Sequence, residues 1–117
     1  MKPIHLDKLN ELQLAAGIAA RVVTAESMSV AFVQIAAGSL LPEHHHPNEQ
    51  VVCVIEGELE LTVDGEPHSL VPDRVMVLPP NLPHSGRAIT DCRVIDVFHP
   101  VREDFRRSAS GGSEDRD

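Results

Sequence analysis

Short β-rich segments, separated by turn residues at regular intervals, constrain the fold of this chain more than any other feature. The segments are rich in Val, Ile and other residues that favour strands, and Gly, Pro or Asp ends most of them. The predicted strands are 21–25, 28–36, 51–55, 58–63, 67–71, 75–78, 87–90 and 93–98. No stretch supports a helix of typical length, so the pattern predicts an all-β fold, a small sandwich or barrel.

Length and the distribution of turns predict a single domain. The chain has 117 residues, enough for one core without covalent staples. We assign residues 1–19 to an N-terminal extension, 20–106 to the β-barrel and 107–117 to a tail. The tail is small and charged, and we expect it to be disordered. Asp64-Gly65, between two predicted strands, is typical of a hairpin turn.

Three adjacent histidines precede the most apolar strand. If this segment is extended, side chains two residues apart point to the same side. His44, His46 and Gln50 then share one side, and His45 and Glu49 the other. Two imidazoles and an amide oxygen that converge could hold a divalent first-row metal. The alternative is a solvated polar loop in which the histidines occur by chance.

Composition excludes several functional classes. The net charge is −8, Trp and Tyr are absent, and the only lysines are Lys2 and Lys8. Nucleic acid is not an expected partner, because it requires a basic face or stacking aromatic side chains. A Schiff-base or phosphate-loop lysine is excluded as well. No apolar run is long enough to cross a membrane. With no signal-peptide pattern and two cysteines, the sequence predicts a cytoplasmic protein.

The chain resembles the cupin superfamily in two motifs. In the first, Gly38, His44, His46, Gln50 and Gly57 fall at the family's spacings, with Gln50 where Glu is usual. In the second, the matching positions are Asp73, Pro79, Asn81, His84 and Ala88. Two of its glycines are thus replaced by Asp and Asn, and its final Asn by Ala. Asn is among the few residues that tolerate a left-handed backbone, so we expect these two replacements to cost the fold little. The resemblance implies a cupin-type jelly-roll β-barrel with a metal inside it.

Within the cupins, the chain resembles the KdgF type. The similarity lies in HHHPNEQ, EGELELTVDGE and DVFHPVREDF, and runs from about residue 20 to Phe105. It implies conversion of 4,5-unsaturated uronate monosaccharides, from pectin or alginate, into linear ketonised sugars. It also implies a small-molecule sugar acid as substrate and, by analogy with cupins generally, a homodimer. The implied metal ligands are His44, His46, Gln50 and His84, and the implied substrate-site residues are Asp96, Phe98 and Arg102.

The ligand set and the closing strand suggest how such a site would work. Ligands of this type suit Ni, Zn, Fe, Mn or Co. Asp96 and Phe98 share one face of the strand 93–98, and a carboxylate between apolar neighbours is costly to bury. Asp96 could therefore face solvent, or it could transfer protons in the barrel mouth. Arg102 could be a surface charge, or it could bind the substrate carboxylate.

Two other functional classes remain open on the sequence. The same ligands with Fe or Ni would suit a metal-dependent dioxygenase. A cupin could also bind a sugar or another small ligand without turnover, with or without a metal.

Overall fold

Two antiparallel sheets make up the computed structural model of this protein, which describes residues 1–106. The described strands follow a turn of 3₁₀ helix at Leu6–Lys8. In chain order they are β1 (Leu12–Ala15), β2 (Ile18–Thr24), β3 (Ser29–Ile35), β4 (Leu40–His44), β5 (Glu49–Glu56), β6 (Leu59–Val63), β7 (Glu66–Leu70), β8 (Val75–Leu78), β9 (His84–Ala88) and β10 (Cys92–His99). Residues 103–106 add one helical turn.

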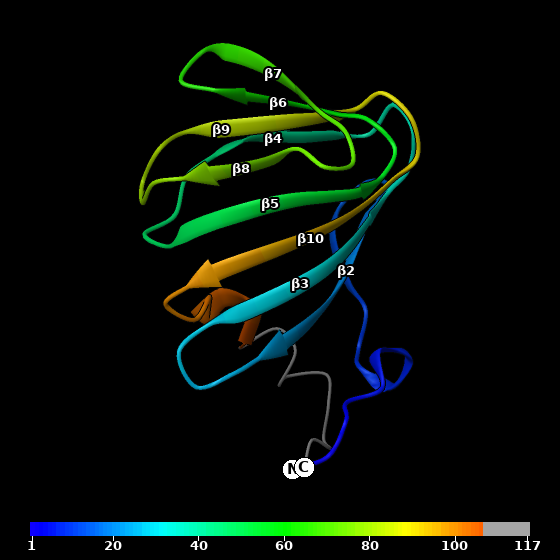
Figure 1. The fold of residues 1–117 in the computed structure, drawn as a ribbon, viewed down its shortest axis with the longest axis vertical. Helices are drawn as coiled ribbons and strands as arrows, with labels where there is room; N and C mark the ends of the chain where they lie inside the picture. The colour runs from blue at the N-terminus through cyan, green and yellow to red at the C-terminus, as the bar shows by residue number, and fades with distance from the viewer. Residues whose placement is uncertain (107–117) are drawn as a thin grey trace.

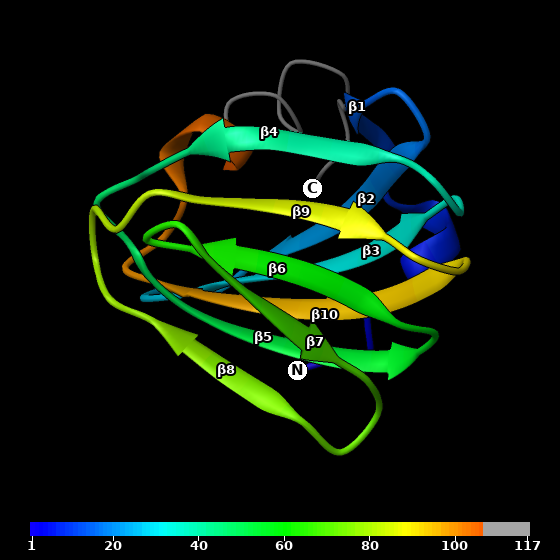
Figure 2. The same cartoon turned by 90° about the horizontal axis from the view of Figure 1, so that it is seen from above.

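The two sheets face each other across the core. The six-stranded sheet has the order β1-β2-β3-β10-β5-β8, and the four-stranded sheet the order β4-β9-β6-β7. In Figure 1, β10 runs between β3 and β5, and Figure 2 shows the four-stranded sheet lying across the six-stranded one. Strands far apart in the chain are neighbours in space, as in a jelly roll. The predicted all-β jelly-roll fold is confirmed.

Alternation along the strands produces the core. In β2 and β3 every second side chain is buried, as expected for strands with one face inward. The inward side chains of the six-stranded sheet, such as Val33 and Val54, join those of the four-stranded sheet, such as Leu59 and Leu61, in one cluster. This core fixes the strand ends from which the candidate site is built.

Turn geometry agrees with the substitutions seen in the sequence. Asp64 (φ 51°) and Gly65 (φ 80°) join β6 to β7, which confirms the predicted hairpin. Asp73 (φ 78°) and Asn81 (φ 65°) also have left-handed backbones. These are the two positions where the cupin motif has Gly, and both residues adopt the conformation that Gly would supply.

The sheet begins earlier than the sequence predicts. β1 pairs with β2, and β2 starts at Ile18, so both enter the segment 1–19 that we assigned to an extension. β1 is only four residues long and lies at the edge of its sheet. A short edge strand carries little periodic signal, which explains why the pattern did not reveal it.

Two further corrections concern the strands beside the histidines. β4 was not predicted, because it contains Pro42 and is largely exposed. It is an edge strand of the four-stranded sheet, a position where Pro is tolerated. His84 was placed on a bend, but it is the first residue of β9.

The prediction for the tail 107–117 lies outside the described residues. Among residues 1–106, no helix is long and apolar enough to cross a membrane.

Candidate functional site

Three histidines gather where the two sheets open at one end. His44 is the last residue of β4 and His84 the first of β9, and the two lie directly opposite each other in the ladder. His46 follows in the loop that leads to β5. One side-chain nitrogen of each lies within 4.8 Å of the others. His46 and His84 are buried, at 7% and 3% exposure. This spacing fits three ligands of one metal ion.

Each imidazole is oriented by a backbone carbonyl two residues away. In every case the Nδ1 atom faces the carbonyl and Nε2 is left for the centre of the cluster. The distances are 3.0 Å from His44 to Pro42, 3.1 Å from His46 to Asn48 and 2.8 Å from His84 to Leu82. A neutral imidazole that donates Nδ1–H keeps its Nε2 lone pair for a metal. The three rings are thus held as ligands before any ion arrives.

Gln50 adds a fourth candidate metal ligand, its side-chain oxygen, beside the three histidines. Its Oε1 lies 3.0 Å from Nε2 of His46. Burial, followed by the charge of Arg102, lowers the pKa of His46 to about 4, so this ring is neutral near pH 7. With its proton on Nδ1, the ring and the amide oxygen then present two acceptors to each other. Nε2 of His84 is also buried and has no partner among the described residues. A cation between these atoms would satisfy all three, so the donor set fits a divalent metal.

Asp96 lies behind Gln50 on the inner face of β10. The residue is half-buried, but its Oδ1 atom is fully buried and has no hydrogen-bond partner among the described residues. Burial raises the pKa of Asp96 to about 6, against a hydrogen bond from the Gln50 side chain and the charge of Arg102. That bond turns the Gln50 NH₂ toward Asp96 and therefore its oxygen toward the histidines. A carboxyl group with this pKa can accept and release protons near neutral pH.

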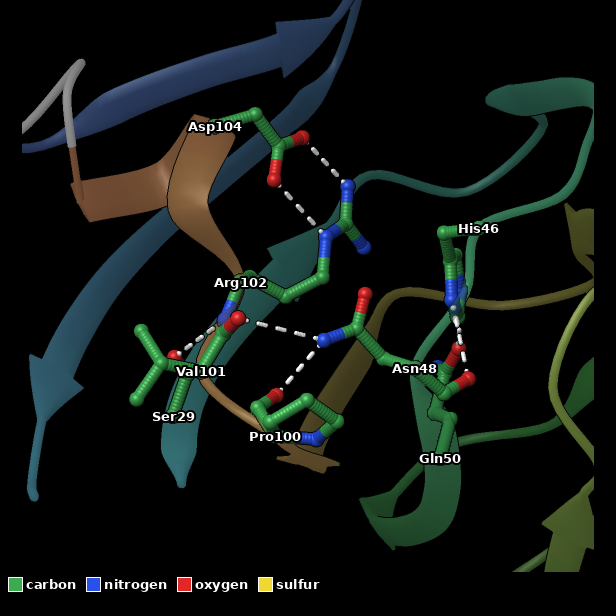
Figure 3. A network of polar contacts seen from close by, with 8 residues as sticks. All are labelled: Ser29, His46, Asn48, Gln50, Pro100, Val101, Arg102 and Asp104. Atoms are coloured by element: carbon green, nitrogen blue, oxygen red, sulfur yellow. Dashed lines mark hydrogen bonds and ion pairs between the residues drawn. The ribbon is translucent and has the colours of Figure 1, made fainter. Parts of the chain in front are cut away.

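Arg102 follows β10 and points back over the site. Its Nε and Nη2 donate to the two carboxylate oxygens of Asp104, at 2.9 and 2.6 Å. The guanidinium also stacks on Phe98 and Phe105, 4.9 and 4.0 Å from the ring centroids. The hydrogen bond from Arg102 lowers the pKa of Asp104. Figure 3 shows this forked contact. Arg102 is therefore a fixed cation, with a side chain only 11% exposed.

One cavity of about 620 Å³ brings most of the predicted residues together. His44, Gln50, Asp96, Phe98 and Arg102 all contribute to its wall. The segment from Glu11 to Leu14, which includes most of β1, closes another side. The part of the chain that we assigned to an extension is thus a wall of this cavity.

The alternation of side chains along an extended segment placed His44, His46 and Gln50 together, but it does not explain why they converge. His45 and Glu49 are exposed, whereas His46 and Gln50 are buried. The segment is not one strand, however, because β4 ends at His44 and β5 begins at Glu49. The rings converge because the loop between the strands folds His46 inward. Phe98 is buried at 3% exposure and contacts the His46 ring.

Sequence reasoning missed several residues that support the site. They are Ser29, Asn48, Asp104 and Phe105, which contact Arg102 or the backbone next to it. Asn48 lies between the histidines and β5, and Asp104 and Phe105 follow Arg102 closely, so their positions were a weak signal. Ser29 begins β3 and lies far from the others in sequence, so no local pattern could have revealed it.

Comparison with known proteins agrees with the fold. A family model described as a cupin domain matches residues 31–98. The polyketide synthase CurC of Streptomyces cyaneus is 38% identical over 63 residues, which cover 53% of this chain and 41% of that protein. The chain therefore spans less than half the length of that relative.

Solved structures resemble the chain over most of its length. KdgF from Halomonas sp. is 26% identical, with a TM-score of 0.78, over 85% of this chain and 94% of that one. Ectoine synthase from P. lautus is 22% identical, with a TM-score of 0.80, over 92% and 86% of the two chains. The second likeness concerns the fold alone, and it shows that this fold can carry enzymatic activity.

Proposed function

The chain belongs to the cupin family, and we propose that it is a metal-dependent enzyme that opens and ketonises 4,5-unsaturated uronate monosaccharides. The observation that carries the proposal is the common cavity. His44, His46, His84 and Gln50, which we call the donor cluster, reach this space of about 620 Å³ through His44 and Gln50, and Asp96 and Arg102 line the same space. The similarity to KdgF, over nearly the full length of that chain, supports the same reaction.

The guanidinium supports a carboxylate-bearing substrate. Asp104 uses Nε and one donor of Nη2 of Arg102. A guanidinium has five N–H donors in one plane, so its other edge can bind a second carboxylate. Phe98 and Phe105 stack on the guanidinium and keep that edge from rotating. We assign Arg102 to the substrate carboxylate and Phe98 to the wall that orients the sugar.

Asp96 supports the proton transfers that the reaction needs. Ring opening removes the proton of the anomeric hydroxyl and breaks the bond from C1 to the ring oxygen, which gives an aldehyde and an enolate. Protonation at C4 then gives the ketone at C5, so the product is an isomer of the substrate. Asp96, with a pKa of about 6, can accept the first proton and return one to carbon. A divalent ion on His44, His46, His84 and Gln50 would supply positive charge next to the developing enolate.

The test is the loss of ultraviolet absorbance of the unsaturated uronate. Purified protein is added to lyase-generated monosaccharide, with and without chelator, and the spontaneous decay is subtracted. We expect faster decay that chelator abolishes and added metal restores. Decay at the spontaneous rate, with one metal per chain confirmed, would overturn the proposal. Oxygen uptake with a phenolic or thiol substrate would then indicate a dioxygenase, and binding without turnover a ligand-binding cupin.

A further inference from the structure

The segment that carries Arg102 is tied to the rest of the protein by two buried polar side chains. The side-chain amide of Asn48 donates to the carbonyl oxygens of Pro100, at 2.5 Å, and Val101, at 3.3 Å. The hydroxyl of Ser29 accepts from the backbone N–H of Arg102, at 2.9 Å. Asn48 is 4% exposed and Ser29 is fully buried. Figure 3 shows both contacts on the same short stretch of backbone.

Asn48 also contacts the donor cluster through its main chain. Its carbonyl oxygen accepts from Nδ1 of His46, at 3.1 Å. The same residue therefore orients a candidate metal ligand with its backbone and holds the Arg102 segment with its side chain. Asn48 therefore joins the donor cluster to the segment that carries Arg102.

We propose that Asn48 is a positioning residue that sets the guanidinium of Arg102 relative to the donor cluster. The proposal rests on the proposed function in one respect, the assignment of Arg102 to the substrate carboxylate. The physical reason is that a side chain stacked on Phe98 and Phe105 has little room to compensate for a moved backbone. A misplacement of about 1 Å can slow an enzymatic reaction about a hundredfold, even when its cause lies away from the reacting atoms.

The first expected consequence is weaker binding of the substrate carboxylate. Asn48→Ala removes the two amide donors but keeps the backbone carbonyl that His46 uses. We expect the KM for the uronate to rise about tenfold, the equivalent of one lost hydrogen bond, with a smaller change in kcat. Metal affinity should stay within about threefold, because the variant keeps the carbonyl that orients His46. Loss of a group that orients a metal ligand would lower the affinity tenfold or more.

A double-mutant cycle separates positioning from a general structural role. If Asn48 acts through Arg102, then Asn48→Ala has no further effect on KM when Arg102→Ala is already present. Thr90→Ala is the matched control. Thr90 lies between β9 and β10, and its hydroxyl accepts from the backbone N–H of Glu58 at 3.0 Å. Thr90→Ala therefore removes a side-chain hydrogen bond without touching this network. We expect its KM to equal that of the wild type.

A spectroscopic readout tests the inference even if uronates are not the substrate. Nε–H of Arg102 donates to Asp104, so its ¹⁵N–¹H signal is protected from exchange, and Arg102→Lys identifies it by removing it. We expect Asn48→Ala to shift or broaden this signal, and Ser29→Ala to do so more weakly. Thr90→Ala leaves it in place. If Asn48→Ala does not fold, Asn48→Ser, which keeps a shorter donor, takes its place.

The outcomes distinguish the two proposals. An unchanged Arg102 signal in a folded Asn48 variant, or additive effects on KM in the cycle, would overturn the role of Asn48. Absence of uronate turnover in the wild type, together with a shifted Arg102 signal in the variant, would overturn the proposed function and leave the positioning role supported.

Discussion

Replacing Asp96 with Asn should stabilise the metal-free protein at neutral pH. Burial raises the pKa of Asp96 from 3.8 to about 6. At about 1.36 kcal/mol per pKa unit, the ionised carboxylate costs the folded state about 3 kcal/mol. Asn has nearly the same shape and carries no charge, so the variant avoids this cost.

The sign of the effect fixes its pH dependence. The pKa of Asp96 is raised in the folded state. The stability contributed by its protonated carboxyl group is therefore fully present below pH 3.8 and is lost as the pH rises through about 6. The gain in unfolding free energy for Asp96→Asn should therefore be about 3 kcal/mol at pH 7.5 and close to zero near pH 4. Denaturant unfolding of both proteins with chelator present, at steps between these pH values, measures the difference.

Asp104→Asn is the matched control, because the same chemical change should have the opposite sign. The hydrogen bond from Arg102 lowers the pKa of Asp104, so its contribution to stability is present above pH 3.8 and is lost on acidification. We expect a small destabilisation at pH 7, because this side chain is 55% exposed and screened by solvent. If Asp96→Asn were no more stable than the wild type at pH 7.5, or if its gain did not change with pH, the reasoning about the buried carboxylate would be refuted.

Other predictions concern the metal, the substrate and the surface. His84→Ala should weaken Zn²⁺ or Ni²⁺ binding by at least about tenfold in calorimetry; wild-type affinity would contradict a role for His84 as a ligand. Arg102→Lys keeps the charge but loses the forked contact, so KM for the uronate should rise at least about tenfold with metal affinity unchanged; equal KM values would argue against carboxylate binding. Val75 and Val77 are 59% and 57% exposed on the edge strand β8, and the expected homodimer could cover them. Val77→Lys should then lower the mass found by light scattering, and a wild-type monomer would rule this out.

Much of the fold could be predicted because the strands report their own periodicity. The strands of the core alternate cleanly, and the left-handed turns fall at residues that favour them, as at Asp64 and Asn81. The edge strands β1 and β4 could not be found in this way. One is very short and the other contains Pro42, and both depend on pairing with a neighbour rather than on local preference.

The grouping of the site could be predicted only in part. Residue spacing placed the histidines and Gln50 together, and the likeness to cupins added His84 and Asp96. The support around Arg102 could not be predicted, because it depends on contacts between distant segments. Asn48 reaches Pro100, 52 positions away, and Ser29 contacts Arg102 across 73 positions. Such contacts follow from how the sheets are stacked, which no local pattern contains.

The cost of Asp96 is itself an argument about function. A cupin that only bound an anionic sugar would need the guanidinium of Arg102 and an apolar wall, and a buried carboxylate would oppose it. Asp96 is nevertheless buried beside Gln50, with one oxygen lacking a partner among the described residues. Groups that destabilise a protein in this way are concentrated where chemistry requires a shifted pKa. The combination of the donor cluster, a carboxyl group near its pKa and a fixed cation therefore favours catalysis over simple binding.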